Sequence, residues 1–191
     1  MLQKTAEAVT KDDRQLAKAV NFGLLYGQGA EGLVRYALNS YGVTLELEQA
    51  KALRSAFFKH YTGLAAWHKK AWEKASSTTE GRTLLGRRRL VTGETATDWD
   101  RFQALVNFRV QGTAADCLKL AMVELALQLD PYDAQLVATV HDELIVECPR
   151  ADAESIQNIC VNTMISAANK ILHSSIPIEV DAKICSNWGD K

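Results

Sequence analysis

The chain has 191 residues, of which 47% are hydrophobic and 24% charged, with a formal net charge of −1. This length suits one domain or two small ones, and this composition excludes global disorder. No apolar run approaches the length of a spanning helix, and the first residues lack the apolar core of a signal peptide. The 4 cysteines are scattered without a CxxC pair, which favours reduced thiols of an intracellular protein over a disulfide framework or a zinc site.

The first half of the chain predicts helices. Apolar residues at three-to-four spacing predict a helix over 12–27, and a glycine-rich break separates it from a short helical stretch that ends at Gly42. Thr44 is the expected N-cap of a longer amphipathic run to about Ala75, which Gly63 can split.

The second half mixes helices and strands. Residues 76–100 are rich in small and polar side chains and predict a loop with a short hairpin around 82–90. A long helix then ends at Asp130-Pro131, and two β-like runs separated by three residues are typical of a hairpin. The predicted segments are a helix over 100–129, strands over 135–140 and 144–148, a helix over 152–172 and a strand over 178–184.

Two glycine-rich strings look like nucleotide-binding loops but lack the required context. Residues 27–32 match GxGxxG, yet no strand precedes them, so a flexible turn that ends a helix is the simpler interpretation. Residues 81–88 look like a Walker loop, but arginines replace its lysine and its Ser or Thr. A basic turn that contacts a nucleic-acid backbone, or a solvated loop, fits that string better.

Four side chains form a row along the first predicted helix. Arg14, Lys18, Phe22 and Tyr26 recur at intervals of four, so each lies about 40° around the helix from the last. Cations near a helix start interact unfavourably with the helix dipole, which favours acidic residues there, and a bound triphosphate would offset this cost. The alternative is an amphipathic helix with solvated cations and aromatic rings in the core.

Two polar groups in the second half could also carry chemistry. Asp142 lies between two β runs, where a carboxylate can bind a divalent cation, although aspartate is also common in ordinary turns. His141 and Glu143 are most simply polar residues of that turn. Asn107 and Gln111 lie one helical turn apart and can contact bases or sugars, or cap internal backbone.

Together these patterns resemble the DNA polymerase I family, the family A DNA polymerases. They occur in the family's order and approximate spacing, and they cover essentially the whole chain. The matching segments are 14–27 (motif B, the O helix), 86–89, 107–116 (the Q helix), 140–143 (motif C) and 187–188.

The resemblance implies a role for each residue of the O-helix row. Arg14 and Lys18 would bind the triphosphate of the incoming nucleotide, and Lys18 would donate a proton to the pyrophosphate leaving group. Phe22 would stack near the nucleotide sugar, and Tyr26 would guard the templating position.

The resemblance also implies contacts to DNA and to a metal. Asn107 and Gln111 would probe the minor groove of the new base pair, where acceptors occur in every sequence. The other implied contacts are to DNA from His141, Arg87 and Arg88, and to Mg²⁺ from Asp142 and Glu143.

The sequence departs from the family in several places. Gln103 and Arg109 stand where arginine and proline are expected, and Cys185 replaces a usual glycine. The family's motif A, a palm strand with an aspartate, precedes the O helix and has no counterpart here, since Asp12 and Asp13 adjoin the O helix instead. Two-metal phosphoryl transfer needs both carboxylates, so we expect the isolated chain not to polymerise.

The predicted fold is α+β, with a helical fingers subdomain at 1–95 and a partial palm at 96–191 that lacks the motif A strand and the thumb. The implied function is DNA-directed DNA polymerase, with Lys18 and Asp142 facing one cleft. The expected partners are primer–template DNA, dNTP, Mg²⁺ and an upstream segment that carries motif A and the thumb, with no membrane. We expect a cytoplasmic protein of a bacterium or phage, or one of another intracellular DNA compartment. The alternatives are a non-catalytic module that binds nucleotide or DNA, and an unstable relic.

Overall fold

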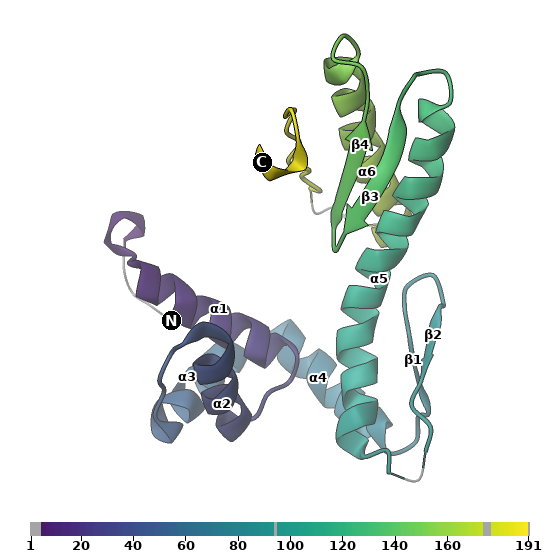
Figure 1. Cartoon of the computed structure of the whole chain (residues 1–191). Helices are drawn as coiled ribbons and strands as arrows, with labels where there is room; N and C mark the ends of the chain where they lie inside the picture. The colour runs from purple at the N-terminus through teal and green to yellow at the C-terminus, as the bar shows by residue number, and fades with distance from the viewer. Residues whose placement is uncertain (1–4, 94, 174–176, 191) are drawn as a thin grey trace. The chain divides into compact units, whose positions relative to one another are not determined.

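The computed structural model of the chain describes residues 5–93, 95–173 and 177–190. It is mainly helical with two small antiparallel sheets, which confirms the α+β prediction (Figure 1). The helices are α1 (Lys11–Leu25), α2 (Ala30–Tyr41), α3 (Leu47–His60), α4 (Thr62–Ala75), α5 (Asp98–Leu129) and α6 (Ala153–Leu172), with 3-10 helices at Ala6–Ala8 and Trp188–Asp190. The strands are β1 (Glu80–Arg82), β2 (Arg88–Leu90), β3 (Gln135–Val140) and β4 (Glu143–Glu147). No described helix is long and apolar enough to cross a membrane.

The chain divides into two compact units. Unit 1 comprises Met1–Gly81 and Arg89–Asn107, and unit 2 comprises Arg82–Arg88 and Phe108–Lys191. Helix α5 runs through the boundary between them. The division into fingers and palm at residues 95 and 96 is a functional one and stays a prediction.

Helix α1 has a buried side and an exposed side. It begins at a capping box, in which the Thr10 hydroxyl accepts from the Asp13 N–H at 3.2 Å and the Asp13 carboxylate accepts from the Thr10 N–H at 2.9 Å. On one side of the helix, Ala19, Val20 and Leu24 are buried in a hydrophobic cluster with α2 and α3. This packing fixes the other side of α1 as a surface of unit 1.

The boundaries of α2, α3 and α4 follow the sequence with one exception. Gly42 ends α2 in the left-handed conformation at φ 66°, as the sequence predicts. The next helical run is split as predicted, but at Tyr61, between α3 and α4, and not at Gly63, which lies in the first turn of α4. The predicted N-cap at Thr44 is wrong, because Glu46 precedes α3 and its N–H donates to Gln49 Oε1 at 3.0 Å.

Unit 2 is built around the β3–β4 hairpin. The strands pair antiparallel, with an irregularity in register between Leu136 and Ala138. Side chains of the hairpin pack on the C-terminal half of α5 and on α6, in a cluster that includes Leu125, Leu129 and Ile156. Each strand therefore has one face in the core and, within the described residues, one edge without a strand partner.

The predicted C-terminal strand over 178–184 is absent from the structure. Residues 177–187 form no strand. A strand requires a partner for its backbone groups, and the described β3 and β4 pair only with each other. The segment is instead attached through a side chain, since Gln157 Nε2 donates to the Ala182 carbonyl at 2.9 Å.

Candidate functional site

The row of cations and aromatic rings lies on the exposed side of α1. Arg14 and Lys18 are exposed, and Phe22 keeps 45% of its surface exposed although it is a large apolar residue. Tyr26 is half-buried at the end of the helix. The alternative in which these rings form the core is therefore wrong for Phe22. An exposed aromatic ring beside two cations is a surface suited to a ligand with phosphates and a flat or apolar part.

The helix-dipole argument for a bound triphosphate is weaker in the structure than in the sequence. Asp12 and Asp13 both lie in the first turn of α1 and supply the acidic charge that this end favours. The Asp13 carboxylate also accepts from the Thr10 hydroxyl at 2.8 Å. The exposed row itself, and not an uncompensated helix end, is what points to a ligand.

Two side chains from other helices bind the C-terminal end of α1. Gln103 Nε2, on α5, donates to the Tyr26 carbonyl at 2.9 Å. His68 Nε2, on α4, lies 2.9 Å from the Leu25 carbonyl. Burial is the main cause that lowers the pKa of His68 below its ordinary value, so the neutral ring donates this hydrogen bond. Both contacts satisfy carbonyls that a helix end leaves without partners, and they hold Tyr26 in place.

The turn after α1 confirms that the GxGxxG string is not a dinucleotide loop. Helices α1 and α2 flank it, and no strand precedes it in the described residues 5–26. Gly27 has φ 87°, and a Cβ there would lie 2.3 Å from Phe102 Cε1. The glycine is therefore needed for the turn and for the close approach of Phe102, not for a phosphate.

Asn107 and Gln111 leave their amide groups available on α5. Asn107 is half-buried and Gln111 is exposed. Neither amide has a hydrogen bond to any residue in the described part of the chain. The alternative, in which the two amides cap internal backbone, therefore receives no support from these contacts.

Arg87 is engaged inside unit 2. Its Nε donates to Asp116 Oδ1 at 2.6 Å and its Nη2 donates to the Gly112 carbonyl at 2.7 Å, while its guanidinium lies 5.4 Å from the centre of the Phe108 ring. Asp116 is only 6% exposed, and its Oδ2 has no hydrogen-bond partner among the described residues. Arg87 therefore attaches its loop to α5, and its predicted contact with DNA stays a prediction.

The basic loop around Arg87 is not a Walker loop, because it leads into strand β2 and not into a helix. Arg88, at the start of β2, is exposed. The loop packs tightly on α5, where a Cβ on Gly112 would lie 2.7 Å from Thr83 Cγ2. The absence of a side chain at Gly112 permits this close packing.

The β3–β4 turn presents its carboxylate to the surface. Val140 pairs with Glu143, which leaves His141 and Asp142 as a two-residue turn. His141 adopts φ 57°, a left-handed conformation that is uncommon for residues other than glycine. Asp142 is exposed at this tight turn. Such a strained turn is more frequent at functional sites than elsewhere.

A contact from the C-terminal segment orients the second carboxylate. Trp188 Nε1 donates to Glu143 Oε1 at 3.1 Å. The short helix that carries Trp188 is itself held locally, since Asn187 Oδ1 accepts from the Gly189 N–H at 2.9 Å and the Asn187 amide donates to Asp190. The segment around Asn187 and Trp188 therefore acts in this unit by positioning Glu143.

The turn offers two of the carboxylate groups that a Mg²⁺ site requires, but no complete set of protein ligands among the described residues. Asp142 and Glu143 are adjacent residues with hard carboxylate oxygens, and Mg²⁺ in proteins is commonly held by one or two carboxylates together with water and substrate phosphates. Within the described residues, no group of three or more His, Cys, Asp or Glu side chains could hold a metal. The shared cleft of Lys18 and Asp142 concerns both units and stays a prediction.

Sequence patterns did not reveal the residues that position the site. The sequence marks Gln103 only as a departure from the family, and it gives no signal for His68. The ion pair of Arg87 with Asp116 joins residues 29 positions apart. Local periodicity carries no signal for such contacts.

Comparisons with known proteins agree with these features. Residues 1–190 match the family described as DNA polymerase family A. The chain is 42% identical to DNA polymerase I of Aquifex aeolicus over 98% of its length, and 34% identical to the thermostable DNA polymerase I of Thermus aquaticus over 95%. These matches span 32% and 21% of the two relatives, so the chain corresponds to a third or less of their length.

A solved structure shows the same relationship. The POL domain of Pol1 from M. smegmatis, in complex with DNA primer-template and dNTP, superposes with a TM-score of 0.73 and 25% sequence identity. The match covers 84% of this chain and 28% of that chain. By its sequence over almost its full length and by its fold, this chain belongs to DNA polymerase family A.

Proposed function

We propose that the chain supplies the nucleotide-binding helix and one metal-binding carboxylate of a DNA-directed DNA polymerase. In this reaction the primer 3′-hydroxyl attacks the α-phosphate of a dNTP and pyrophosphate leaves. The observation that carries the proposal is the exposed row on α1, in which Arg14, Lys18 and Phe22 point away from the core of unit 1. Membership of family A supports the same substrates, as do the DNA primer-template and dNTP in the complex of the solved relative.

The residues of unit 1 take the following roles in this proposal. Arg14 and Lys18 neutralise the triphosphate, and Lys18 donates a proton to the leaving pyrophosphate. The exposed ring of Phe22 packs against the nucleotide sugar. Tyr26, whose carbonyl accepts from Gln103 at the end of α1, sits at the templating position.

Residues of α5 and of unit 2 contact the DNA and the metal. The amides of Asn107 and Gln111, which bind no described protein group, contact minor-groove acceptors of the new pair. His141 and the basic residues Arg87 and Arg88 contact the DNA backbone or the primer end.

Asp142 is the metal ligand in this proposal, and Glu143, oriented by Trp188, assists it. When bound, Mg²⁺ stabilises the negative charge that develops on the reacting phosphate. We place the second metal-binding carboxylate, and the strand that carries it, in a segment outside these 191 residues. The two outer edges of the β3–β4 sheet, which pair with no described strand, offer such a strand a place to pair.

The test is primer extension with the upstream polymerase segment restored. The experiment uses a chimera in which these 191 residues replace the matching third of DNA polymerase I from Aquifex aeolicus, to which they are 42% identical. A cooperative thermal melt confirms that the chimera folds. We expect template-directed synthesis that Asp142→Ala abolishes. A folded chimera that binds dNTP and primer–template but never extends the primer would instead show a non-catalytic binding module.

A further inference from the structure

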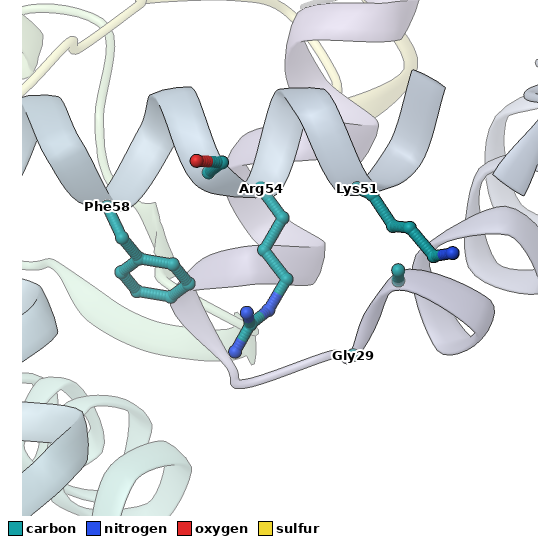
Figure 2. Close-up of a pocket in the computed structure, with 6 residues that line it drawn as sticks. Gly29, Lys51, Arg54 and Phe58 are labelled. Atoms are coloured by element: carbon teal, nitrogen blue, oxygen red, sulfur yellow. The ribbon is translucent and has the colours of Figure 1, made fainter. Parts of the chain in front are cut away.

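Helix α2 has one open side and one tightly packed side. Toward α3, the start of α2 borders an open cavity of about 470 Å³ that is lined by side chains of α3 such as Lys51 and Arg54 (Figure 2). Toward α1 the two helices are in contact, and Leu33 and Ala37 of α2 are buried there. Tyr36 lies on this second side, so its ring belongs to the contact between α1 and α2.

A glycine on α1 makes room for the Tyr36 ring. A Cβ on Gly23 would lie 3.1 Å from Tyr36 Cδ1 and 2.9 Å from Leu33 Cδ1. Both distances are shorter than ordinary contacts between carbon atoms, so a larger residue at this position would displace the ring. Glycine inside a helix lowers the stability of that helix relative to alanine. The close position of the Tyr36 ring accounts for a glycine at position 23.

The Tyr36 ring also lies next to the end of α1. Tyr26 follows Gly23 by three positions, and its N–H donates to the Phe22 carbonyl at 3.3 Å, so Tyr26 continues the helical path. Residues three positions apart are neighbours on the surface of a helix. The ring that packs against Gly23 therefore borders the side chain of Tyr26.

The phenol groups of three tyrosines lie close together at this place. The rings of Tyr36 and Tyr41 lie edge to face, with their centres 5.6 Å apart and an interplanar angle of 73°. Burial and the neighbouring Tyr41 hydroxyl raise the pKa of Tyr36 to about 12, and the nearby Tyr26 contributes to this increase. At neutral pH the Tyr36 hydroxyl is therefore protonated, and it can both donate and accept a hydrogen bond.

The contact from α5 fixes the backbone of Tyr26 but not its ring. Gln103 Nε2 donates only to the Tyr26 carbonyl, at 2.9 Å. A side chain on a fixed backbone still has a small number of staggered rotamers, and its neighbours select among them. Tyr36, one helical turn away across the contact with α2, is such a neighbour for the half-buried ring of Tyr26.

We propose that Tyr36 is a positioning residue for Tyr26. Its ring fills the space beside Gly23, and its hydroxyl holds the Tyr26 ring in the orientation that acts at the templating position. Tyr36 itself touches neither nucleotide nor DNA, and it lies outside the segments that carry the family resemblance. The consequence for the reaction rests on the proposed function, in which Tyr26 sits at the templating position and a misplaced ring rejects mismatched nucleotides less well.

The first measurement follows the Tyr26 ring without DNA. Fluorotyrosine is incorporated into the 191-residue chain, and the fluorine NMR resonances are assigned through single Tyr→Phe variants. Tyr36→Phe keeps the ring beside Gly23, so the chain should still melt cooperatively, but the Tyr26 resonance should shift. The matched control, Tyr61→Phe, removes a hydroxyl from an exposed position of the same unit and should leave that resonance in place. An unchanged Tyr26 resonance in Tyr36→Phe overturns the proposal, as does an equal shift in the control.

The second measurement asks whether Tyr36 acts through Tyr26. The chimera gives kcat/KM for a matched and a mismatched nucleotide in Tyr36→Phe, in Tyr26→Ala and in the double variant. Tyr36→Phe should lower the ratio of matched to mismatched kcat/KM by about fivefold, the effect of losing one hydrogen bond between neutral groups. It should lower the ratio no further when Tyr26 is already replaced, because its effect passes through that ring. An equal loss in both backgrounds, or no loss in either, overturns the proposal.

Failure of the proposed function gives a different result. If the chimera does not extend a primer, or if Tyr26→Ala leaves the ratio unchanged, the role of Tyr26 at the templating position is wrong. The fluorine resonance still decides in that case whether Tyr36 positions the Tyr26 ring. If Tyr26→Ala lowers the ratio while Tyr36→Phe changes neither the ratio nor the resonance, the role of Tyr26 stands and the proposal for Tyr36 is overturned.

Discussion

In unit 1 the candidate residues follow the geometry of one helix, whereas in unit 2 they depend on contacts between segments far apart in the sequence. The row on α1 is exposed because the opposite side of the same helix, with Val20 and Leu24, is buried. In unit 2, Glu143 is oriented by Trp188 and the basic loop is attached through Arg87 and Asp116. Function and stability should therefore separate by helix side in unit 1, whereas in unit 2 they should be coupled at the residues that make these long-range contacts.

The largest effect is expected at the β3–β4 turn. In the chimera that restores the upstream segment, Asp142→Ala should lower the rate of primer extension by roughly 1,000-fold or more, because metal stabilisation of the reacting phosphate contributes several kcal/mol. Asp142 is exposed, so the melting temperature should change little. Single-turnover extension and a thermal melt check both parts, and retention of most of the rate would contradict the role of Asp142.

Arg87→Met tests whether the basic loop and α5 are coupled. The variant leaves the buried carboxylate of Asp116 without its ion pair. We expect a loss of about 2 kcal/mol in the free energy of unfolding, less than for a fully buried pair because Arg87 is 40% exposed. Urea denaturation measures it, with the exposed Lys119→Met as the control. Equal losses in the two variants would show that this contact does not hold the loop.

A pair of substitutions on α1 tests the separation by helix side. Val20→Ala, at a position 1% exposed, should cost about 2 kcal/mol of stability and leave dNTP affinity unchanged in the folded protein. Phe22→Ala, at a position 45% exposed, should change stability by less than about 0.5 kcal/mol and weaken dNTP binding several-fold. Calorimetric titration and denaturation together give both quantities. Loss of stability at Phe22 without loss of binding would reverse the assignment of the two sides.

The smallest effect concerns the contact of His68 with the end of α1. Because burial holds the pKa of His68 below its ordinary value, the unfolded chain binds the proton more readily. The contribution of His68 to the free energy of unfolding should therefore fall as pH decreases below about 6.5, by at most about 1.4 kcal/mol per pH unit. His68→Gln keeps an N–H donor but does not titrate. The free energy of unfolding of each protein is measured by denaturation from pH 7 to pH 5. The difference between the two values should change with this slope, and a difference that stays constant with pH would contradict the prediction.

The sequence predicted most of the fold because its signals are local. Glycine at position 42, the short gap between the two β runs and the periodicity of α1 each determine the backbone near them. The prediction failed at 178–184, because a local sequence pattern does not supply a strand partner. It also failed at Thr44, because Glu46, nearer the helix, is the N-cap.

The candidate site could be predicted only in part. The spacing of Arg14, Lys18 and Phe22 identified the row, but not which side of the helix is buried. The anchoring contacts of Gln103 and Trp188 join segments 77 and 45 positions apart. Such contacts depend on how the helices and the hairpin pack, which composition and periodicity do not encode.

The central claim is that the exposed row of α1 and the turn at Asp142 act on one nucleotide. Affinity cleavage with Fe²⁺ in place of Mg²⁺ tests it directly, because radicals formed at the bound metal cut the nearby backbone. With primer–template, dNTP, ascorbate and peroxide, mass spectrometry should find cuts both near Lys18 and near Asp142, and excess Mg²⁺ should suppress both. Cuts at only one of the two places, in a folded chain that has bound DNA and dNTP, would contradict the account.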